Sequence, residues 1–320
     1  MSGDSRRQDS VASGGHAERI ALVGPTAVGK SEVGLLLAER LGGEIVTVDS
    51  MQVYRGLDLG TAKPGAGERS RVPHHLIDVA DLNEPFDAAK FVRLASEAIR
   101  DIQSRGRIPI LCGGTGFYFK ALRDGLGDSP EGNTGLRAEL EAIPLAELLQ
   151  ELAERDPVTF GRIDRSNARR VIRAVEVIRL TGRRFSEMQS RPDSAPPVAS
   201  VRRDPIFGLM RSSEDLRTRI EARVDAMFER GLVSETRRLL DCGLASNPTA
   251  MQALGYRQVV GHLRGERSLQ DTIALVKQRT WQFARRQMTW FRRQLPVTWI
   301  QWEAGCPAEA IVDRVTSLLS

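Results

Sequence analysis

The sequence predicts an α/β fold in which a parallel sheet is flanked by helices and interrupted by a helical insertion. Up to residue 124, short apolar and β-branched runs alternate with segments of helical periodicity, as parallel strands and their crossover helices do. Strand-like runs then disappear between residues 125 and 197, and return after residue 204. We therefore expect one core domain from residues 19–124 and 198–320, with 125–197 as the insertion.

The first strand and helix carry the clearest signals. Residues 20–24 read IALVG and run into Pro25, which predicts a buried strand that stops at a turn. The next segment, SEVGLLLAERL, has apolar residues at helical spacing and ends at Gly42 and Gly43, so it predicts a helix with a C-terminal stop. Similar patterns predict strands at 44–50, 74–79 and 108–114 and a helix at 87–104.

The second half of the chain is predicted to be mostly helical. Within the insertion, helical periodicity marks residues 145–156 and 167–182, and the flanks are rich in Gly, Pro and Ser, as linkers are. The core then continues with a strand at 205–210, a long helix at 269–293 and a late strand at 297–302. The polar residues 1–18 predict a disordered tail.

Composition excludes several classes of protein. Hydrophobic residues make up 41% of the 320 residues and charged residues 27%, which argues against wholesale disorder. Three scattered cysteines without a Cys-x-x-Cys pair exclude a disulfide framework and a cysteine zinc site, and Cys112 reads as a core residue. We found neither a signal peptide nor a membrane span, so we expect a cytoplasmic protein that does not enter a membrane. Adjacent residues of a strand face opposite sides, so we expect no shared metal ion at His74 and His75.

Positive charge is concentrated in two segments, although the net charge is only +5. Residues 161–184 hold eight arginines and two acidic residues, and residues 277–293 hold six basic residues and no acidic one. In the first segment, Arg165, Arg169 and Arg173 are spaced to form a ridge on one helical face, which would suit phosphates. A solvated basic face is the alternative for each segment, and the aromatic residues of the second segment suit either RNA or a core.

Residues 24–31 match the phosphate-loop pattern G-x4-G-K-[ST] between a strand and a helix, which is the context that the motif requires. Backbone N–H groups and the helix N-terminus bind phosphate, Lys30 adds a full positive charge, and the Ser31 hydroxyl can hold Mg²⁺. The motif predicts a P-loop NTPase-like fold with a bound diphosphate or triphosphate, and leaves open whether ATP is the ligand. The expected phosphate-binding residues are Gly24, Pro25, Thr26, Ala27, Val28, Gly29, Lys30 and Ser31.

Polar residues follow two other predicted strands, where ligands of α/β sheets bind. Asp49 ends the second strand and could hold a Mg²⁺-bound water, act as a general base, or cap a turn. Thr115 lies in a Gly-Gly-Thr-Gly sequence after another strand, where the glycines permit close backbone approach. An ordinary strand-to-helix turn is the alternative there.

These motifs resemble the bacterial tRNA dimethylallyltransferases, also called tRNA isopentenyltransferases. The resemblance runs in order through GPTAVGKS, VDSMQVYRGLDLGTAKP, PHHLIDV, GGTGFYFKAL, NARRVIRAVEV, LGYRQ and RRQMTWFR. It implies transfer of a dimethylallyl group from dimethylallyl diphosphate to the 6-amino group of adenosine 37 of tRNA, with Mg²⁺ as cofactor. It also implies that the insertion binds tRNA, with the anticodon stem-loop as the partner, and we expect a monomer. Around Asp164 the chain departs from the family's usual His-Pro-Asn-Asp.

The resemblance assigns roles to individual residues. Asp49 matches the proposed general base, Thr115 matches a residue near the accepting region of the tRNA, and Lys30 is expected to stabilise the leaving diphosphate. Arg223 resembles an arginine that points at the diphosphate, with Arg219 as its neighbour, although an exposed helical arginine is the alternative for both. The expected tRNA-binding residues are Asp49, Ser50, Met51, Gln52, Thr115, Arg137, Arg169, Arg170, Val171, Ile172, Arg173, Gln252, Ala253, Leu254, Gly255, Tyr256 and Arg257. Arg286 and Gln287 are further candidates for donor or tRNA contacts.

Two other functions remain open at this point. A small-molecule or nucleotide kinase would also explain the phosphate loop and Asp49, but would leave the two basic segments without a role. An RNA-binding protein with a vestigial phosphate loop would explain the basic segments, but not the intact Lys30 and Ser31.

Overall fold

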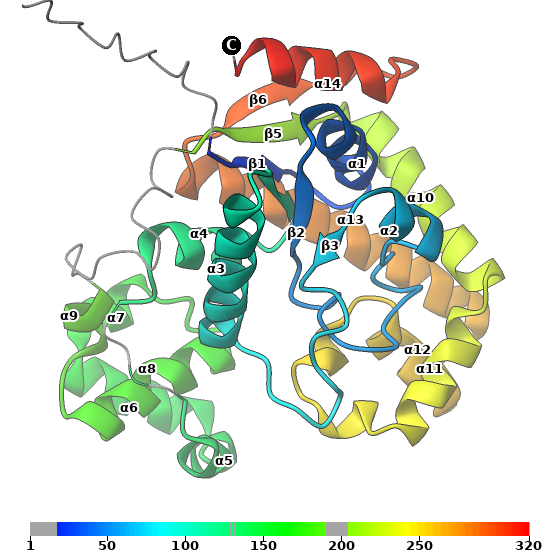
Figure 1. The fold of residues 1–320 in the computed structure, drawn as a ribbon. Coiled ribbons are helices and arrows are strands. Elements are labelled where there is room, and N and C mark those ends of the chain that lie inside the picture. The colour runs from blue at the N-terminus through cyan, green and yellow to red at the C-terminus, as the bar shows by residue number, and fades with distance from the viewer. Residues whose placement is uncertain (1–17, 128–129, 131, 190–203, 320) are drawn as a thin grey trace, which may run out of the picture.

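Six parallel strands form the sheet at the centre of the molecule (Figure 1). The computed structural model describes residues 18–127, 130, 132–189 and 204–319. The strand order β3-β2-β4-β1-β5-β6 puts β1 in the middle, so the turn that follows it opens at the centre of the sheet. The strands are β1 (Ile20–Val23), β2 (Glu44–Val48), β3 (His74–His75), β4 (Pro109–Gly113), β5 (Ile206–Met210) and β6 (Thr298–Gln301).

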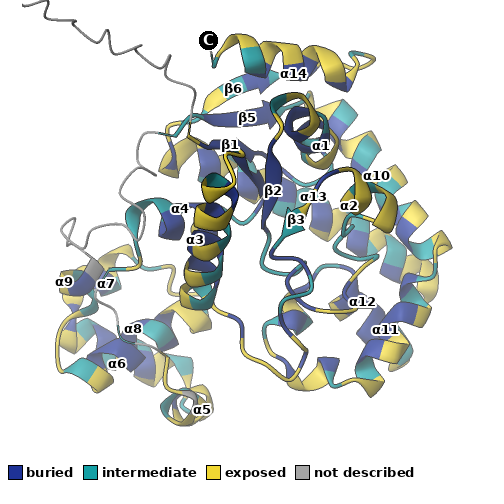
Figure 2. Ribbon diagram, viewed as in Figure 1, coloured by how far each residue is buried: buried dark blue, intermediate teal, exposed yellow. Residues whose placement is uncertain are grey.

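Helices cover both faces of the sheet, as predicted. Ile20 and Leu22 of β1 belong to one apolar cluster, whereas Ala21 and Val23 belong to another, because side chains alternate along a strand. Both faces of β1 are therefore buried, as Figure 2 shows for the central strands. The first cluster holds α1 (Lys30–Leu41), α10 (Ser213–Glu229) and α14 (Ala308–Ser317), and the second holds α3 (Ala88–Ser104), α4 (Gly116–Asp124), α11 (Leu232–Asp241) and α12 (Tyr256–Leu263). The long helix α13 (Leu269–Gln294) contributes to both.

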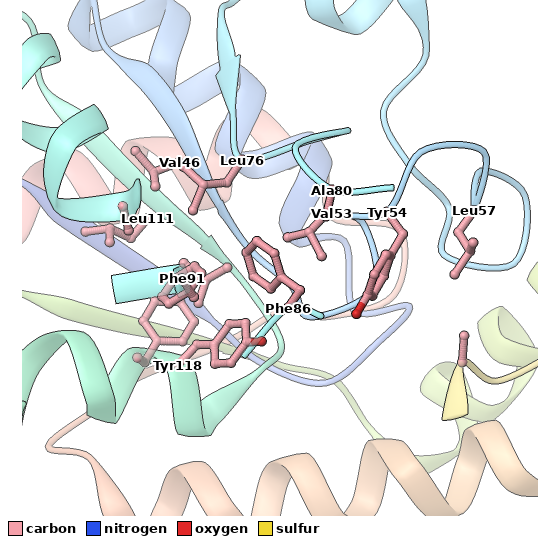
Figure 3. Packing of buried hydrophobic residues seen from close by; sticks show 14 of the residues in the cluster. Val46, Val53, Tyr54, Leu57, Leu76, Ala80, Phe86, Phe91, Leu111 and Tyr118 are labelled. Atoms are coloured by element: carbon pink, nitrogen blue, oxygen red, sulfur yellow. The ribbon is translucent and has the colours of Figure 1, made fainter. Parts of the chain in front are cut away.

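Aromatic packing fixes the loop that follows β2. Phe91 of α3 and Tyr118 of α4 stack with their ring centroids 4.2 Å apart. Tyr54, just beyond β2, meets Phe86 edge-on at 6.4 Å. Figure 3 shows these four rings together with Val53 of the same loop. The loop after Asp49 is therefore held by the core.

The insertion helices have an apolar cluster of their own. Val171 and Val175 of α8 pack there with Leu148 and Leu152 of α6, and both helices bury an amphipathic stripe. Figure 1 shows this group beside the end of α3, away from α14. Its helices are α5 (Thr134–Ala142), α6 (Leu145–Arg155), α7 (Pro157–Arg162), α8 (Ala168–Thr181) and α9 (Phe185–Gln189). The remaining helical elements are α2 (Ala66–Arg71) and two 3₁₀ turns, Leu244–Ser246 and Ala250–Gln252.

The predicted elements differ from the structure at a few boundaries. The strand expected at 74–79 stops at His75, because Leu76 and Asp78 have φ values of 62° and 56°, which no extended strand allows. The helix expected from 87 begins at Ala88, since the Asp87 side chain caps it by accepting from the Lys90 N–H. The predicted tail lies almost wholly, and the linker-like segment at 190–200 wholly, outside the described residues. None of the described helices is long and apolar enough to cross a bilayer.

Candidate active site

A cavity of about 600 Å³ opens where the strands end, beside the phosphate loop. Its walls come from the loop after β1, the ends of β2 and β4, residues 61–64, and helices α10 and α13. Of the predicted site residues, the structure brings to this cavity Thr26, Ala27, Gly29, Lys30, Ser31, Asp49, Gln52, Arg219, Arg223 and Gln287. Ligands of open α/β sheets bind at this edge, so the position agrees with the motif.

The phosphate loop is held in shape from outside. Gln287 of α13 accepts a hydrogen bond from the Thr26 N–H at 2.8 Å, and Arg219 of α10 donates to the Ala27 carbonyl at 2.9 Å. Arg211 donates to the Val28 carbonyl at 2.8 Å and lies 3.8 Å from the centre of a Trp302 ring. The loop therefore depends on residues that lie far along the chain.

Gly29 shows why the loop needs glycine. Its φ of 108° is one that other residues rarely adopt. A Cβ at Gly29 would also lie 2.4 Å from the Trp302 ring. Trp302 can therefore pack against the loop only because residue 29 has no side chain.

Two cations, Lys30 and Arg223, lie partly buried in the cavity wall. The pKa of Lys30 is lowered from 10.5 to about 8, mainly by burial and also by the nearby Arg223, whereas Cys112 and Asp49 oppose the shift. Burial likewise lowers the pKa of Arg223, with Asp49 again opposing. An anion bound between the two cations would offset this cost, so the cavity has the electrostatics of a diphosphate site.

Asp49 combines the roles that the sequence left open. Its Oδ1 accepts from the backbone N–H groups of Met51 at 2.8 Å and Gln52 at 3.2 Å, so it does cap a turn. Both bonds end on the same oxygen, and the carboxylate still lines the cavity. The turn bonds fix the orientation of the carboxylate, which is what a general base requires.

Thr115 joins the ends of β2 and β4. Its Oγ1 accepts from the Ser50 N–H at 3.1 Å. Close approach at this point requires glycine, as predicted: a Cβ at Gly113 would lie 2.0 Å from the Val48 carbonyl oxygen, and one at Gly114 would lie 2.4 Å from Gln287. Asp49 and Thr115 thus follow the ends of β2 and β4, which are neighbours in the sheet.

The arginines of the insertion that the structure describes do not line this cavity. Arg137 and Arg173 both pair with Glu176 at 2.8 Å, and Glu176 is fully buried. The predicted three-residue ridge is wrong at Arg165, because α8 begins only at Ala168, and Arg165 instead lies over the Phe160 ring.

Two of the predicted tRNA-binding segments meet at the Pro248 carbonyl. Arg169 of α8 donates to it at 2.8 Å, and Gln252 donates to it at 3.4 Å. Arg170 and Arg257 are exposed in the same segments. The side chains of Val171, Ile172, Ala253 and Tyr256 are buried in the apolar clusters, so they are not exposed to a partner.

Sequence reasoning missed several residues of the site. No motif in the sequence marks Arg211 as a residue that holds the phosphate loop, or the loop from Thr61 to Pro64 as a wall of the cavity. The residues GTAKP do lie within the segment VDSMQVYRGLDLGTAKP, which resembles the family. His74 donates from Nδ1 to the Val72 carbonyl, and His75 donates from Nε2 to the Glu44 carboxylate. In the described part of the chain, no group of three His, Cys, Asp or Glu side chains is placed to hold a metal ion.

The fold and this site define a phosphate-loop α/β protein with an anion pocket, a fixed carboxylate and a helical insertion. A family model described as "IPP transferase" matches residues 52–294, and the chain belongs to that family. The tRNA dimethylallyltransferase of Geobacter metallireducens is 47% identical over 89% of this chain and 93% of its own length. The tRNA dimethylallyltransferase of Desulforudis audaxviator is 44% identical over 93% of this chain and 97% of its own length.

Solved structures agree with the family assignment. The tRNA isopentenylpyrophosphate transferase of Bacillus halodurans superposes with a TM-score of 0.69 at 39% identity, covering 94% of this chain and 97% of that one. A eukaryotic dimethylallyltransferase acting on tRNA gives a TM-score of 0.77 at 26% identity, covering 94% of this chain and 79% of that one. The predicted family and the P-loop NTPase-like fold are confirmed, and the kinase alternative is not favoured.

Proposed function

We propose that this protein is a transferase that moves a dimethylallyl group from dimethylallyl diphosphate to the 6-amino group of adenosine 37 of tRNA. The observation that carries the proposal is one cavity that combines the phosphate loop, the partly buried Lys30 and Arg223, and the fixed Asp49 carboxylate. The names of the relatives supply the substrate class, tRNA.

The donor half of the reaction belongs to the phosphate loop. As the carbon–oxygen bond of the donor breaks, negative charge accumulates on the departing diphosphate, and Lys30 and Arg223 stabilise it. Ser31 lines the same cavity, and oxygen atoms are the ligands that Mg²⁺ prefers, so its hydroxyl fits the ion. When bound, Mg²⁺ would neutralise charge on the diphosphate oxygens.

The acceptor half belongs to Asp49. The amine of adenine is a weak nucleophile, so its proton must leave as the new nitrogen–carbon bond forms. Asp49 accepts that proton, and the products are the N6-dimethylallyl adenosine and free diphosphate. The Thr115 hydroxyl accepts a hydrogen bond from the backbone of the segment that contains Asp49, and so helps to hold that segment in place beside the acceptor.

We assign tRNA binding to the insertion, residues 125–197, and to the segment that meets it at Pro248. Arg169, Arg170, Gln252 and Arg257 are exposed there and suit phosphates of an anticodon stem-loop. The proposal includes a monomeric protein that acts in the cytoplasm, without a membrane partner.

A label-transfer assay tests the function. The protein is incubated with Mg²⁺, radiolabelled dimethylallyl diphosphate and unmodified tRNA, with AMP in place of tRNA as the control acceptor. Label in tRNA but not in AMP supports the proposal. Absence of transfer, together with ATP-dependent phosphorylation of a metabolite, would overturn it in favour of a kinase.

Asp49→Ala separates catalysis from donor binding. We expect transfer to fall by about 10²-fold or more, the usual contribution of a general base, while dimethylallyl diphosphate still binds. Single-turnover rates and equilibrium donor binding measure the two quantities. A variant that turns over near the wild-type rate would exclude Asp49 as the base.

A further inference from the structure

A buried carboxylate that does not line the cavity binds the loop that forms one wall of the cavity. Glu235 of α11 is only 4% exposed. Its carboxylate accepts from the Leu59 N–H at 3.0 Å and from the Asp58 N–H at 3.3 Å. The Tyr256 hydroxyl donates to the same group. A buried carboxylate that accepts from several backbone and hydroxyl donors is a rigid fixture, because each bond satisfies part of its charge.

Tyr256 completes the arrangement. It is fully buried, and its hydroxyl oxygen accepts from the Gly60 N–H at 3.0 Å while its proton is donated to Glu235. Burial raises the pKa of Tyr256, and the adjacent Glu235 raises it further, so the hydroxyl keeps that proton. The ring also packs against Gly60, where a Cβ would lie 2.4 Å from a ring carbon. Residues 58–60 therefore lie in a fixed position against α11 and α12.

The loop so held leads directly into the cavity. Figure 3 shows its start, where Tyr54 and Leu57 belong to the buried core. Its next residues, Thr61 to Pro64, line the cavity. The Thr61 carbonyl accepts from the Gln52 side chain at 3.1 Å and from Arg223 at 3.5 Å. One backbone oxygen thus touches both the donor side of the site, through Arg223, and the turn that Asp49 caps, through Gln52.

We propose that Glu235 and Tyr256 are positioning residues that fix the loop from Asp58 to Pro64, and through the Thr61 carbonyl set the place of Arg223. This inference rests on the proposed function and deepens it. Neither side chain lines the cavity, so both act through the loop. The resemblance would instead make Tyr256 a tRNA contact, and the two roles give opposite expectations.

Tyr256→Phe tests the role with little change in packing, since the ring against Gly60 remains. We expect the KM for dimethylallyl diphosphate to rise about fivefold to tenfold, because the hydroxyl loses its bonds to both Glu235 and Gly60, while the Kd for tRNA changes less than about twofold. Glu235→Gln should have the larger effect of the two, because one amide oxygen replaces a carboxylate that accepts three bonds. Asp241→Asn, at an exposed position of the same helix, is the matched control and should leave both constants unchanged.

Hydrogen exchange supplies a readout that needs no transferase activity. The amides of Asp58 and Leu59 should exchange at least about tenfold faster in Glu235→Gln than in the wild type, because their acceptor is weakened. Weaker tRNA binding by Tyr256→Phe with an unchanged donor KM would overturn the proposal, and so would unchanged exchange at Asp58 and Leu59. If the wild type transfers no label to tRNA, the proposed function fails, whereas donor binding and exchange still decide the positioning role.

Discussion

Gln287 makes two hydrogen bonds that join the phosphate loop to the loop that follows β4. Its Oε1 accepts from the Thr26 N–H at 2.8 Å, and its Nε2 donates to the Gly114 carbonyl at 2.9 Å. The side chain is 7% exposed, and a Cβ at Gly114 would strike it. The amide can serve both loops, because its oxygen accepts from one and its nitrogen donates to the other.

Gln287→Met removes both bonds at nearly constant volume. The bond to Gly114 is buried, and leaving that carbonyl without a partner costs about 1–3 kcal/mol. Thr26 is partly exposed, so water can replace its partner and the loss there is about 0.5–1.5 kcal/mol. We therefore expect the free energy of unfolding to fall by roughly 2–4 kcal/mol.

Urea denaturation measures that change, with an unchanged m-value showing that the same surface unfolds. Gln278→Met is the control, because Gln278 is exposed on the same helix and should cost less than about 0.5 kcal/mol. Gln287→Glu adds a second test: the carboxylate cannot donate to Gly114, and its charge lies in the wall of the anion cavity. Donor affinity should fall more in Gln287→Glu than in Gln287→Met. A Gln287→Met protein as stable as the control variant would refute the reasoning.

Two further predictions concern charge. Because the pKa of Lys30 is lowered from 10.5 to about 8, the free protein loses this cation as the pH rises through 8. The affinity for dimethylallyl diphosphate should then fall about tenfold per pH unit above that point, and binding should take up a proton. Calorimetry in buffers of different ionisation enthalpy measures the affinity and the proton uptake, and an affinity that stays constant up to pH 10 contradicts the prediction. Glu176 is fully buried and pairs with both Arg137 and Arg173. Glu176→Gln should therefore lower the free energy of unfolding by about 1–3 kcal/mol, and should weaken tRNA binding because both arginines lose their fixed position. Thermal unfolding and a tRNA titration measure the two effects, and an unchanged tRNA affinity would show that neither arginine needs to be held.

Features of the site that rest on local sequence could be predicted, because short-range physics determines them. The phosphate loop is a strand, a glycine turn and a helix within twelve residues of one another, and each carries its own signal. The alternation of strands and helices likewise gave the parallel sheet. The error at Arg165 has the same origin: helical spacing was read through Asn167, whose side chain caps α8 by accepting from the Arg170 N–H.

The supports of the site could not be predicted, because they join residues that only the fold brings together. Gln287 was a candidate contact in the sequence, but its role as a support was not visible, because it lies 261 positions from Thr26; Glu235 lies 176 positions from Leu59. Neither residue type marks such a role, since a glutamine or glutamate on a helix is most often exposed. The burial of Tyr256 was hidden for the same reason: the motif LGYRQ shows that the segment is distinctive, but not which side chains turn inward.

The positions of these supports imply that the phosphate loop is not an independent N-terminal module. β1 pairs with β5, which follows the insertion, and the loop after β1 is held by Arg211, Arg219 and Gln287 and closed by Trp302. The anion pocket is therefore complete only when the C-terminal part of the chain has joined the sheet. Because the insertion separates the two parts of the core in sequence, its helices must not prevent these two parts from pairing at β1 and β5. A separate apolar cluster within the insertion satisfies this requirement, since those helices can pack among themselves without competing for the faces of the sheet.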